Sequence, residues 1–570
     1  MTADSERTAG SLVELRVLDG ANLYFPRPAV KLTLDLSALL ALGEDQARAV
    51  AEDLGMSAAR PGRPGTGLRQ RFAAKVVARV VRRVAAEAGT TRLAVRSRPT
   101  ADLHRLVVAF PWRRRGKAEA LGRGVADVLD ALTNGDVSAA VSRAAVGVRG
   151  VEAGPTPATR TPHVPLVAVT GTNGKTTTSR MVARMARCAG YVVGWSSTDG
   201  VYIDGELVEA GDYSGPAGAG RVLDDARVQF AVTETARGGI LLRGLGLAHT
   251  DVSVVTNVSA DHLGMQGVDT VDQLAEVKAV ITKITRPGGS VVLNGDDPRT
   301  FAMRLGTSAR AVVFSLDSES PSLRTALNEG GRAITVLDGD ITVLDPRREP
   351  DVLLPVIDVP MTLAGLSHFN VENALAATGA GLAVGLPRAA VIEGLRSFRP
   401  GPEDNPGRMN VYDLHGVTVV IDLAHNEAGV EALLEVLHGL RPPGAVVHLV
   451  MGGVGDRTDD VLRGIGELGA RGADRVAIAH KERYLRGRTT HELEGLMRDG
   501  AAAVGVHDVP AYPNELAAIQ AITDQASVAD VVGVMCHAER EEVDLWLREQ
   551  GATIDGPDEL RRKVLAAATR

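Results

Sequence analysis

The segment from Val167 to Thr178 constrains the fold of this chain more than any other part of its sequence. It reads VAVTGTNGKTTT: a short β-branched and apolar run, a turn containing glycine, and then Lys175 and Thr176 at the start of a predicted helix. Glycine lets backbone N–H groups approach an anion, and the N-terminus of a helix carries a partial positive charge. A strand, a glycine turn and a helix in this order indicate a phosphate-binding loop.

We expect this loop to bind ATP. Its spacing is Gly-x-x-Gly-Lys-Thr, with Val169 in the place of the first glycine of the usual pattern. The side chain of Lys175 is expected to reach the terminal phosphates and to act in catalysis, and the hydroxyl of Thr176 to bind Mg²⁺. The alternative is an ordinary strand-turn-helix unit with a surface lysine, but the flanking strand and helix favour a nucleotide. The predicted nucleotide-binding residues of the loop are Gly171, Thr172, Asn173, Gly174, Lys175, Thr176 and Thr177.

The composition is that of a large α/β protein. Of the 570 residues, 45% are hydrophobic and only 3% are aromatic, which favours Ala/Val/Leu-rich α/β layers over an all-β sandwich. The two cysteines, Cys188 and Cys536, are far apart, so neither a disulfide framework nor a zinc site is expected. No signal peptide and no uncharged apolar run of roughly 20 residues is visible. We therefore expect a cytoplasmic protein without a membrane partner.

The chain is predicted to contain three domains and a linker. Residues 1–150 form a small α+β module, and residues 151–163 form a linker that is rich in proline and threonine. Residues 164–405 follow an α/β pattern that includes an apparently β-rich stretch at 311–363. In residues 406–570 the α/β pattern begins again, which predicts a separate Rossmann-like domain.

Hydrophobic periodicity predicts four strands and two helices in the N-terminal module. The strands are Leu15–Leu18, Val30–Leu36, Leu93–Val95 and Leu106–Phe110, and the helices are Leu68–Ala88 and Lys117–Leu132. In the next two sections the predicted strands are 164–169, 228–233, 251–256, 290–293, 417–422 and 445–451, with helices from Asn370 and at 427–438.

Positive charge is concentrated in the N-terminal module. Residues 1–150 contain 24 Lys and Arg against 15 Asp and Glu, whereas the rest contains 39 against 55. Arg113, Arg114, Arg115 and Lys117 could bind an acidic peptide or polymer. A solvated basic start of a helix is an equally weighted alternative. No aromatic residues are interleaved with these cations, so a nucleic-acid partner is not expected.

Seven further motifs, in order and spacing, resemble the Mur ligase family. They are Thr233–Gly239 (TETARGG), Thr256–Gly264 (TNVSADHLG), Lys278, Asn294–Pro298 (NGDDP), Phe369–Leu375 (FNVENAL), Pro406–Met409 (PGRM) and Ile421–Asn426 (IDLAHN). Within that family, Glu234–Gly239, Asp261–Gly264 and Tyr484–Arg488 are most similar to the C-terminal, Mur-ligase-like half of cyanophycin synthetases. The resemblance covers about residues 160–570. Leu15–Leu36 is weakly similar to the start of the same proteins.

The chain departs from cyanophycin synthetases at the linker. Those proteins carry an ATP-grasp domain between their N-terminal module and their Mur-like half, whereas here residues 151–163 join the two directly. We therefore do not expect the chain to make the polymer alone, and whether a separate ATP-grasp enzyme cooperates is left open. The N-terminal module does not resemble the UDP-binding domain of peptidoglycan Mur ligases, so a nucleotide-linked muropeptide is not the expected substrate.

The resemblance implies an ADP-forming ligase that joins a carboxylate to an amine. ATP would phosphorylate the carboxylate, expected on an aspartyl or glutamyl side chain, and an amino acid or other amine would displace phosphate. This chemistry needs charge neutralisation and alignment rather than a Ser, Cys or His nucleophile. The alternatives are a ligase of free small molecules and a non-catalytic nucleotide-binding scaffold. The oligomeric state is open, with a homo-oligomer among the options.

The resemblance also implies roles for individual residues. Two Mg²⁺ ions are expected, with Thr176, Glu234 and His262 as metal ligands. His262, Lys278 and Arg408 join Lys175 as predicted catalytic residues; Lys278 would be carbamylated to supply a metal ligand, or would be an ordinary solvated lysine. Further expected nucleotide contacts are Asn257, Asn294, Asn373, Arg408, Asp422 and His425. Asn294 and Asn373 could instead cap helices or turns.

Substrate contacts are expected at the cleft and in the last domain. The predicted residues are Arg237, Asp456, Arg457, Arg486 and Arg488. For Arg486 and Arg488, a basic loop in solvent carries equal weight. Leu423 and Glu427 stand where the family has an aromatic residue and a proline, so the loop after Asp422 departs from the family's pattern.

Overall fold

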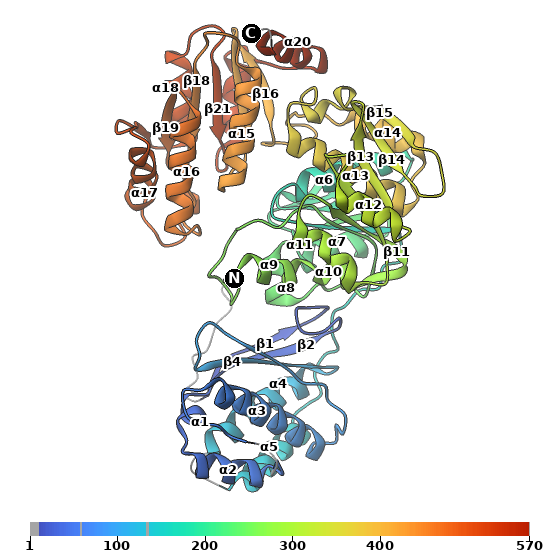
Figure 1. Cartoon of the computed structure of the whole chain (residues 1–570), viewed down its shortest axis with the longest axis vertical. Helices are drawn as coiled ribbons and strands as arrows, with labels where there is room; N and C mark the ends of the chain where they lie inside the picture. The colour runs from blue at the N-terminus through green and yellow to red at the C-terminus, as the bar shows by residue number, and fades with distance from the viewer. Residues whose placement is uncertain (1–10, 57–59, 133–135, 569–570) are drawn as a thin grey trace.

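The computed structural model describes residues 11–56, 60–132 and 136–568. In this part of the chain there are three β-sheets, of four, eleven and seven strands. Each sheet is built from one continuous section of sequence, and the sections follow one another from the blue end to the orange end of the molecule (Figure 1). The α/β fold class predicted from the sequence is confirmed.

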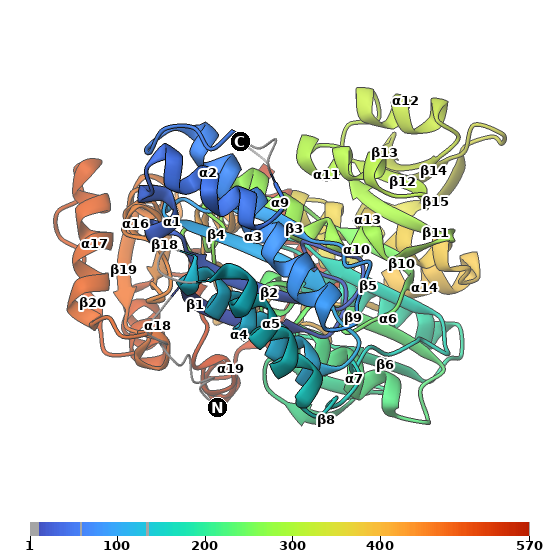
Figure 2. The ribbon, with the colours of Figure 1, turned by 90° about the horizontal axis from the view of Figure 1, so that it is seen from below.

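The N-terminal module is an antiparallel sheet with helices on one face. Its strands are β1 (Leu12–Leu18), β2 (Ala29–Asp35), β3 (Arg96–Pro99) and β4 (Arg105–Pro111), in the order β1-β2-β4-β3. The apolar side chains that alternate along β2 pack against Phe72, Val76 and Val80 of α3 (Gly67–Glu87). Together with α4 (Arg115–Ala131), α3 covers this face of the sheet, and α5 (Val137–Gly150) packs against these two helices (Figure 2). The predicted strand Leu93–Val95 is wrong, since the strand starts at Arg96. The helices α1 (Ser37–Ala41), α2 (Glu44–Asp53) and α5 are additional to the two predicted ones.

The central section is a mostly parallel sheet with antiparallel edges. Its order is β15-β14-β13-β12-β11-β10-β5-β9-β6-β7-β8. The strands are β5 (Leu166–Thr170), β6 (Val193–Ser196), β7 (Gly200–Ile203), β8 (Glu206–Ala210), β9 (Phe230–Glu234), β10 (Thr250–Val255), β11 (Thr285–Asn294), β12 (Arg310–Ser315), β13 (Arg332–Leu337), β14 (Asp340–Leu344) and β15 (Asp351–Pro355). Strand β5 is buried on both faces, which explains its uninterrupted apolar run. The carboxyl ends of the parallel strands meet at one edge, where the loops can form a site.

The stretch predicted to be β-rich, 311–363, contains a helix. Strands β12 and β13 run parallel, and α12 (Pro321–Asn328) connects them. A parallel pair cannot be joined by a hairpin, so its connection must cross the sheet, usually as a helix. Pro321 lies in the first turn of α12, where its missing N–H costs no helical hydrogen bond.

The last section is a seven-stranded sheet with five parallel strands at its core. The order is β20-β19-β18-β21-β17-β16-β22. Its strands are β16 (Asn410–Leu414), β17 (Val417–Asp422), β18 (Val447–Met451), β19 (Arg475–Ala479), β20 (Ala511–Tyr512), β21 (Val531–Met535) and β22 (Thr553–Ile554). The predicted strand 417–422 is confirmed, and the predicted helix 427–438 corresponds to α15 (Glu427–Leu440).

The connection between the N-terminal module and the central section is held against both. The backbone N–H groups of Arg115 and Gly116, at the start of α4, donate to Pro155 O (2.9 Å) and Ala153 O (3.0 Å). Farther along, Arg160 N donates to Gly246 O in the central section at 2.8 Å. The segment is therefore a packed strap and not a free tether. None of the helices in the described ranges is long and apolar enough to cross a membrane.

Candidate active site

The phosphate-binding loop follows β5 and leads directly into α6 (Lys175–Cys188). Gly171 and Gly174 have φ angles of 156° and 85°. A Cβ at Gly171 would lie 1.8 Å from Thr256 Oγ1, and one at Gly174 would lie 2.1 Å from Asn373 Oδ1. Only glycine fits at either position, because the neighbouring elements approach the backbone too closely for a side chain.

The loop is ordered by a neighbouring strand end. Asn257, after β10, accepts the N–H of Asn173 on its Oδ1 (2.9 Å), and its carbonyl accepts the N–H of Thr172 at 2.9 Å. Lys175 folds back so that its Nζ donates to Thr172 O at 2.8 Å. The structure thus places Asn257 and Lys175 at the loop, with Asn257 supporting the backbone that would receive a phosphate.

Thr176 and Glu234 form a hydroxyl–carboxylate pair beside the loop. Thr176 Oγ1 donates to Glu234 Oε2 at 2.8 Å, and Arg408 Nη2 donates to Thr176 Oγ1 at 3.4 Å. Glu234 is only 1% exposed, and its Oε1 has no hydrogen-bond partner among the described residues. Burial raises the pKa of Glu234, although the charge of Lys175 opposes the shift. A buried carboxylate oxygen without a partner, next to a hydroxyl, is a suitable pair of ligands for a hard cation.

His262 is held by a residue from the last section. Nη1 of Arg457 lies 3.0 Å from each ring nitrogen of His262, and Arg457 Nη2 lies 3.5 Å from Asp261. Arg457 is 7% exposed, and its backbone carbonyl accepts a hydrogen bond from Arg488 (3.1 Å). Burial lowers the pKa of His262, and the nearby guanidinium acts in the same direction. The imidazole is therefore the neutral acceptor in this contact.

Lys278 lies beneath the loop and not in solvent. It is 3% exposed, and its Nζ donates to Gly171 O at 2.6 Å. Burial holds the pKa of Lys278 well below its ordinary value, and the charge of Lys175 adds to the shift. The solvated lysine considered from the sequence is thus wrong for this position, because the end of α9 (Val271–Lys278) packs under the loop.

Asn294 and Asn373, predicted as nucleotide contacts or as caps, make protein contacts. Asn294 Nδ2 donates to Thr256 O at 2.9 Å, and its Oδ1 accepts the N–H of Asp296 at 2.8 Å, which forms a turn of the kind expected for asparagine. Asn373 Oδ1 accepts a bond of 3.3 Å from Thr178 Oγ1. Both residues hold the loop and its surroundings together, and their contact with a nucleotide stays a prediction.

Asp422 ends β17, His425 lies in the loop after it, and both side chains are half-buried. Asp422 Oδ2 accepts the N–H of Met409 at 3.0 Å, and burial raises the pKa of Asp422 to about 6. Nδ1 of His425 lies 2.9 Å from Leu423 O, so Nδ1 carries the hydrogen. Burial lowers the pKa of His425 to about 4. His425 is therefore neutral.

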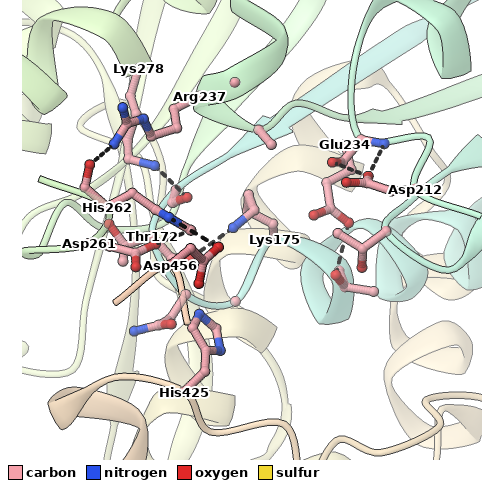
Figure 3. Close-up of a pocket in the computed structure, with 18 of the residues that line it drawn as sticks. Thr172, Lys175, Asp212, Glu234, Arg237, Asp261, His262, Lys278, His425 and Asp456 are labelled. Carbon is pink, nitrogen blue, oxygen red and sulfur yellow. Dashed lines mark hydrogen bonds and ion pairs between the residues drawn. The ribbon is translucent and has the colours of Figure 1, made fainter. Parts of the chain in front are cut away.

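These elements enclose a cavity of about 380 Å³ between the central and last sections. Side chains reach it from several loops, including Lys175, Glu234, Lys278, His425 and Asp456 (Figure 3). Its lining also contains Thr198, Asp212, Ser214, Asp261 and Gln266, which were not among the predicted site residues. The run Gly211–Pro216 could have been recognised as a loop before a helix, but nothing local in it points toward the phosphate-binding loop.

Arg237 lies in the cavity lining, whereas Arg486 and Arg488 do not. Arg486 is exposed, as in the alternative of a solvated basic loop. Arg488 is engaged by two carboxylates, with its Nη2 2.8 Å from Asp459 and 2.6 Å from Glu492. Its visible role is to support Arg457, so a direct substrate contact for either residue stays a prediction.

A second cavity, of about 440 Å³, lies between the same two sections. Asp199 and Tyr202 line it from the central section, and Arg483, His537 and Arg540 line it from the last one. His537 Nδ1 contacts the ammonium of the fully buried Lys481, while its Nε2 has no partner among the residues described. Because Nδ1 accepts, Nε2 carries the hydrogen and remains available as a donor. None of these five lining residues was predicted as a site residue from the sequence.

Comparison with known proteins agrees with the motifs. The family described as Mur ligase middle domain matches residues 169–381, and the Mur ligase glutamate ligase domain matches residues 407–537. Cyanophycin synthetase from Crocosphaera subtropica is 40% identical over 338 residues, which cover 59% of this chain and 38% of that protein. The cyanophycin synthetase from Synechocystis is also 40% identical, over 341 residues with the same coverage. The chain thus spans well under half the length of these relatives.

A shorter relative is matched over more of its length. The UDP-N-acetylmuramoyl-L-alanyl-D-glutamate–2,6-diaminopimelate ligase from Corynebacterium efficiens is 30% identical over 382 residues, covering 65% of this chain and 68% of that protein. Among solved structures, E. coli FolC in complex with ADP has a similar fold, with a TM-score of 0.51 at 20% identity over 68% of this chain and 91% of FolC. The motifs, the matched domains and the fold agree, and the chain belongs to the Mur ligase family.

Proposed function

We propose that this protein is an ADP-forming ligase that uses ATP and Mg²⁺ to join a carboxylate to an amine. The observation that carries the proposal is the Thr176–Glu234 pair beside the phosphate-binding loop, with Glu234 Oε1 buried and without a hydrogen-bond partner in the described part of the chain. A buried carboxylate oxygen of this kind is costly unless a ligand or cation satisfies it. The names of the relatives, which are ligases and synthetases, support the same reaction class.

The residues at the loop suit phosphoryl transfer to a carboxylate. Thr176 and Glu234 would hold Mg²⁺, which would neutralise charge on the phosphates when bound. Lys175 and the N-terminus of α6 would bind phosphate oxygens, and Arg408, whose guanidinium reaches Thr176, would stabilise the γ-phosphate as charge develops. No side-chain nucleophile is needed, because the acceptor carboxylate attacks phosphorus.

Lys278 is proposed to be carbamylated. Burial lowers the pKa of its amine and so favours the uncharged form, which is the form that reacts with CO₂: nitrogen bonds to carbon, and a proton leaves. The product would be a carboxylate close to Gly171 and to the cavity. A second Mg²⁺ bound by this carbamate and by His262 requires Arg457 to leave the imidazole. Binding of that metal would therefore be linked to movement of the last section.

The two substrates are proposed to enter from different sides. Arg237, in the first cavity, and Arg457 would bind the acceptor, as guanidinium groups suit carboxylates. The second cavity is proposed to hold the amine substrate, because His537 offers it a donor that no described residue uses and Arg483 and Arg540 add charged groups. The likeness to cyanophycin synthetase supports an aspartyl or glutamyl side chain as the acceptor.

The test is release of ADP by the full chain with Mg²⁺-ATP, across a panel of free amino acids and acidic peptides. We expect ADP release to depend on an amine, and mass spectrometry to show one new amide bond per ADP. The Lys175→Ala variant serves as the control without phosphate binding. Failure to bind Mg²⁺-ATP, or ADP release without a new C–N bond for every pair tested, would contradict the proposal and favour a nucleotide-binding scaffold.

A further inference from the structure

The turn between β1 and β2 of the N-terminal module is built into the central section. Asp19 N donates to Arg243 O, and Leu245 N donates to Ala21 O, each at 2.8 Å. Arg243 is the last residue of α8 (Arg237–Arg243), and Leu245 comes two positions later, after the C-cap Gly244. The N-terminal sheet consequently lies against α8 and α9 (Figure 1). The module is attached through backbone atoms and not through surface side chains alone.

The two backbones pass each other at glycines. A Cβ at Gly20 would lie 2.3 Å from Gly246 N and 2.9 Å from Gly246 Cα. From the other side, a Cβ at Gly244 would lie 2.9 Å from both N and O of Gly20. Any side chain at Gly20 therefore requires the turn and the end of α8 to move apart, because the obstructing atoms are backbone.

The turn has a fixed shape. Asn22 is 2% exposed, and its Nδ2 donates to Gly20 O and Arg27 O, each at 2.9 Å. Its Oδ1 accepts the N–H groups of Tyr24 and Phe25, each at 3.0 Å. All polar atoms of one buried side chain are thus used to hold the turn, which makes it a rigid support.

The same turn contributes to the core of the central section. Ala21 is 1% exposed and belongs to one apolar cluster with Ile240 of α8 and with Leu245 and Leu247. The C-terminal end of α8 is therefore held by both hydrogen bonds and apolar packing. With seven residues, α8 is about 10 Å long. A displacement at one end is carried to the other, because a helix of two turns does not bend easily.

The opposite end of α8 holds the loop that carries His262. Arg237, the first residue of α8, donates from Nη1 to His262 O and from Nη2 to Met265 O (2.7 Å). His262 and Gln266 have φ angles of 50° and 58°, which non-glycine residues adopt only when their surroundings hold them there. All of these residues line the first cavity.

We infer that the Asp19–Asn22 turn is a positioning element of the ligase centre: it fixes α8 so that Arg237 holds the loop of His262 in place. The inference rests on the proposed function for its link to turnover. It gives the N-terminal module a role in the reaction of every acceptor, short or long. Capture of an acidic polymer by the module would instead affect long acceptors alone.

The test compares Gly20→Ala with Gly147→Ala in the full chain. Gly147 lies in α5 of the same module, and a Cβ there meets no atom within 4 Å, so this variant is a matched control. For Gly20→Ala we expect kcat with a short acidic acceptor to fall on the order of tenfold or more, since small misplacements at a catalytic centre are costly. The KM for ATP should change less than twofold, because the phosphate-binding loop is not attached to the turn. Gly147→Ala should match the wild type.

Hydrogen exchange provides a readout that does not need turnover. Amides of residues 261–266 should exchange faster in Gly20→Ala than in the wild type and in Gly147→Ala, while those of residues 171–178 should not change. If Gly20→Ala does not fold, Asn22→Asp replaces it: the carboxylate keeps the acceptor for Tyr24 and Phe25 but removes the donors to Gly20 and Arg27.

The outcomes separate the two proposals. If the wild type forms no amide bond with any pair of substrates, the proposed function is wrong, and the exchange data alone decide whether the turn supports the His262 loop. A folded Gly20→Ala or Asn22→Asp variant with wild-type kcat and unchanged exchange at residues 261–266 would overturn the positioning role. A loss confined to long acceptors would overturn it as well.

Discussion

Nη1 of Arg457 lies 3.0 Å from each ring nitrogen of His262, although 195 positions separate the two residues in the chain. The contact joins a loop after β18 to a loop after β10, and so joins two of the three sheets across the first cavity. His262 is neutral in this contact, which means that the guanidinium positions the imidazole through a hydrogen bond and not through an ion pair.

Replacement of Arg457 should therefore affect turnover more than nucleotide binding. In Arg457→Ala, we expect kcat for amine-dependent ADP release to fall on the order of tenfold to a hundredfold, since the acceptor loses the guanidinium proposed to align it and Asp261 loses a buried partner. Arg457→Lys should retain part of the activity. The control is Arg463→Ala, whose side chain is half exposed in a pair with the solvent-exposed Asp460. Equal activity of Arg457→Ala and the wild type would rule out this role.

The Glu234→Gln variant should bind ATP in a way that no longer depends on Mg²⁺. The amide keeps the size of the side chain but removes the negative charge that would hold the cation. We expect calorimetry to show that ATP binding no longer strengthens with Mg²⁺, and kcat to fall at least on the order of a hundredfold. Glu206→Gln, on the exposed strand β8, is the control. Retained Mg²⁺ dependence in Glu234→Gln would remove this residue from the metal site.

Lys278 should carry a carbamate when the protein is incubated with bicarbonate. Protein incubated with ¹³C-labelled bicarbonate is expected to give a carbamate signal by NMR that is absent from Lys278→Ala, because burial lowers the pKa of Lys278 and so favours the reactive uncharged amine. Turnover of the wild type should fall when CO₂ is removed. Lys75→Ala is the control, as Lys75 lies exposed on α3. A spectrum without a Lys278-dependent signal would contradict the modification.

The pKa of His425 predicts a specific pH dependence of stability. Its value falls from 6.5 in the unfolded chain to about 4 in the fold. A depressed pKa means that the unfolded state binds more protons, so the contribution is complete above pH 6.5 and is lost as pH falls toward 4. The shift corresponds to roughly 3 kcal/mol. Thermal unfolding of His425→Gln should consequently show a smaller loss of stability between pH 7 and 4.5 than the wild type; parallel curves would disprove the assignment.

The basic start of α4 offers fewer free cations than its sequence suggests. Arg115 pairs with Glu119 at 2.8 Å, and Lys117 Nζ donates to Val148 O and Arg149 O at the end of α5. Arg113 and Arg114 are exposed and have no ion pair among the described residues.

Charge reversal at Arg113 and Arg114 should raise the KM of long acidic acceptors only. The loss should shrink as salt concentration rises, because exposed charges are screened. Arg82→Glu, on α3, is the control for a general change in the charge of the module. Equal effects on short and long acceptors would contradict capture of a polymer by these residues.

Local sequence was sufficient for the phosphate-binding loop, because a buried strand, a glycine turn and the first residues of a helix lie within twelve positions. It was not sufficient for α12, where Pro321 suggests a break although proline fits a first helical turn. Nor could it identify Asp212 as part of the cavity or pair Arg457 with His262. These relationships arise when loops from separate strands meet, and no periodicity in one segment records them.

The strap at residues 153–155 limits how this chain can be rearranged. Gly116 and Gly154 pass so closely that a Cβ on Gly154 would lie 2.6 Å from Gly116 N, and the strap carbonyls complete the first turn of α4. A domain inserted at this point would remove two hydrogen bonds from the start of α4 and would separate the backbones of Gly116 and Gly154. A fusion protein built from this chain should therefore be joined after Pro155, at the exposed Thr156, where the helix keeps its cap.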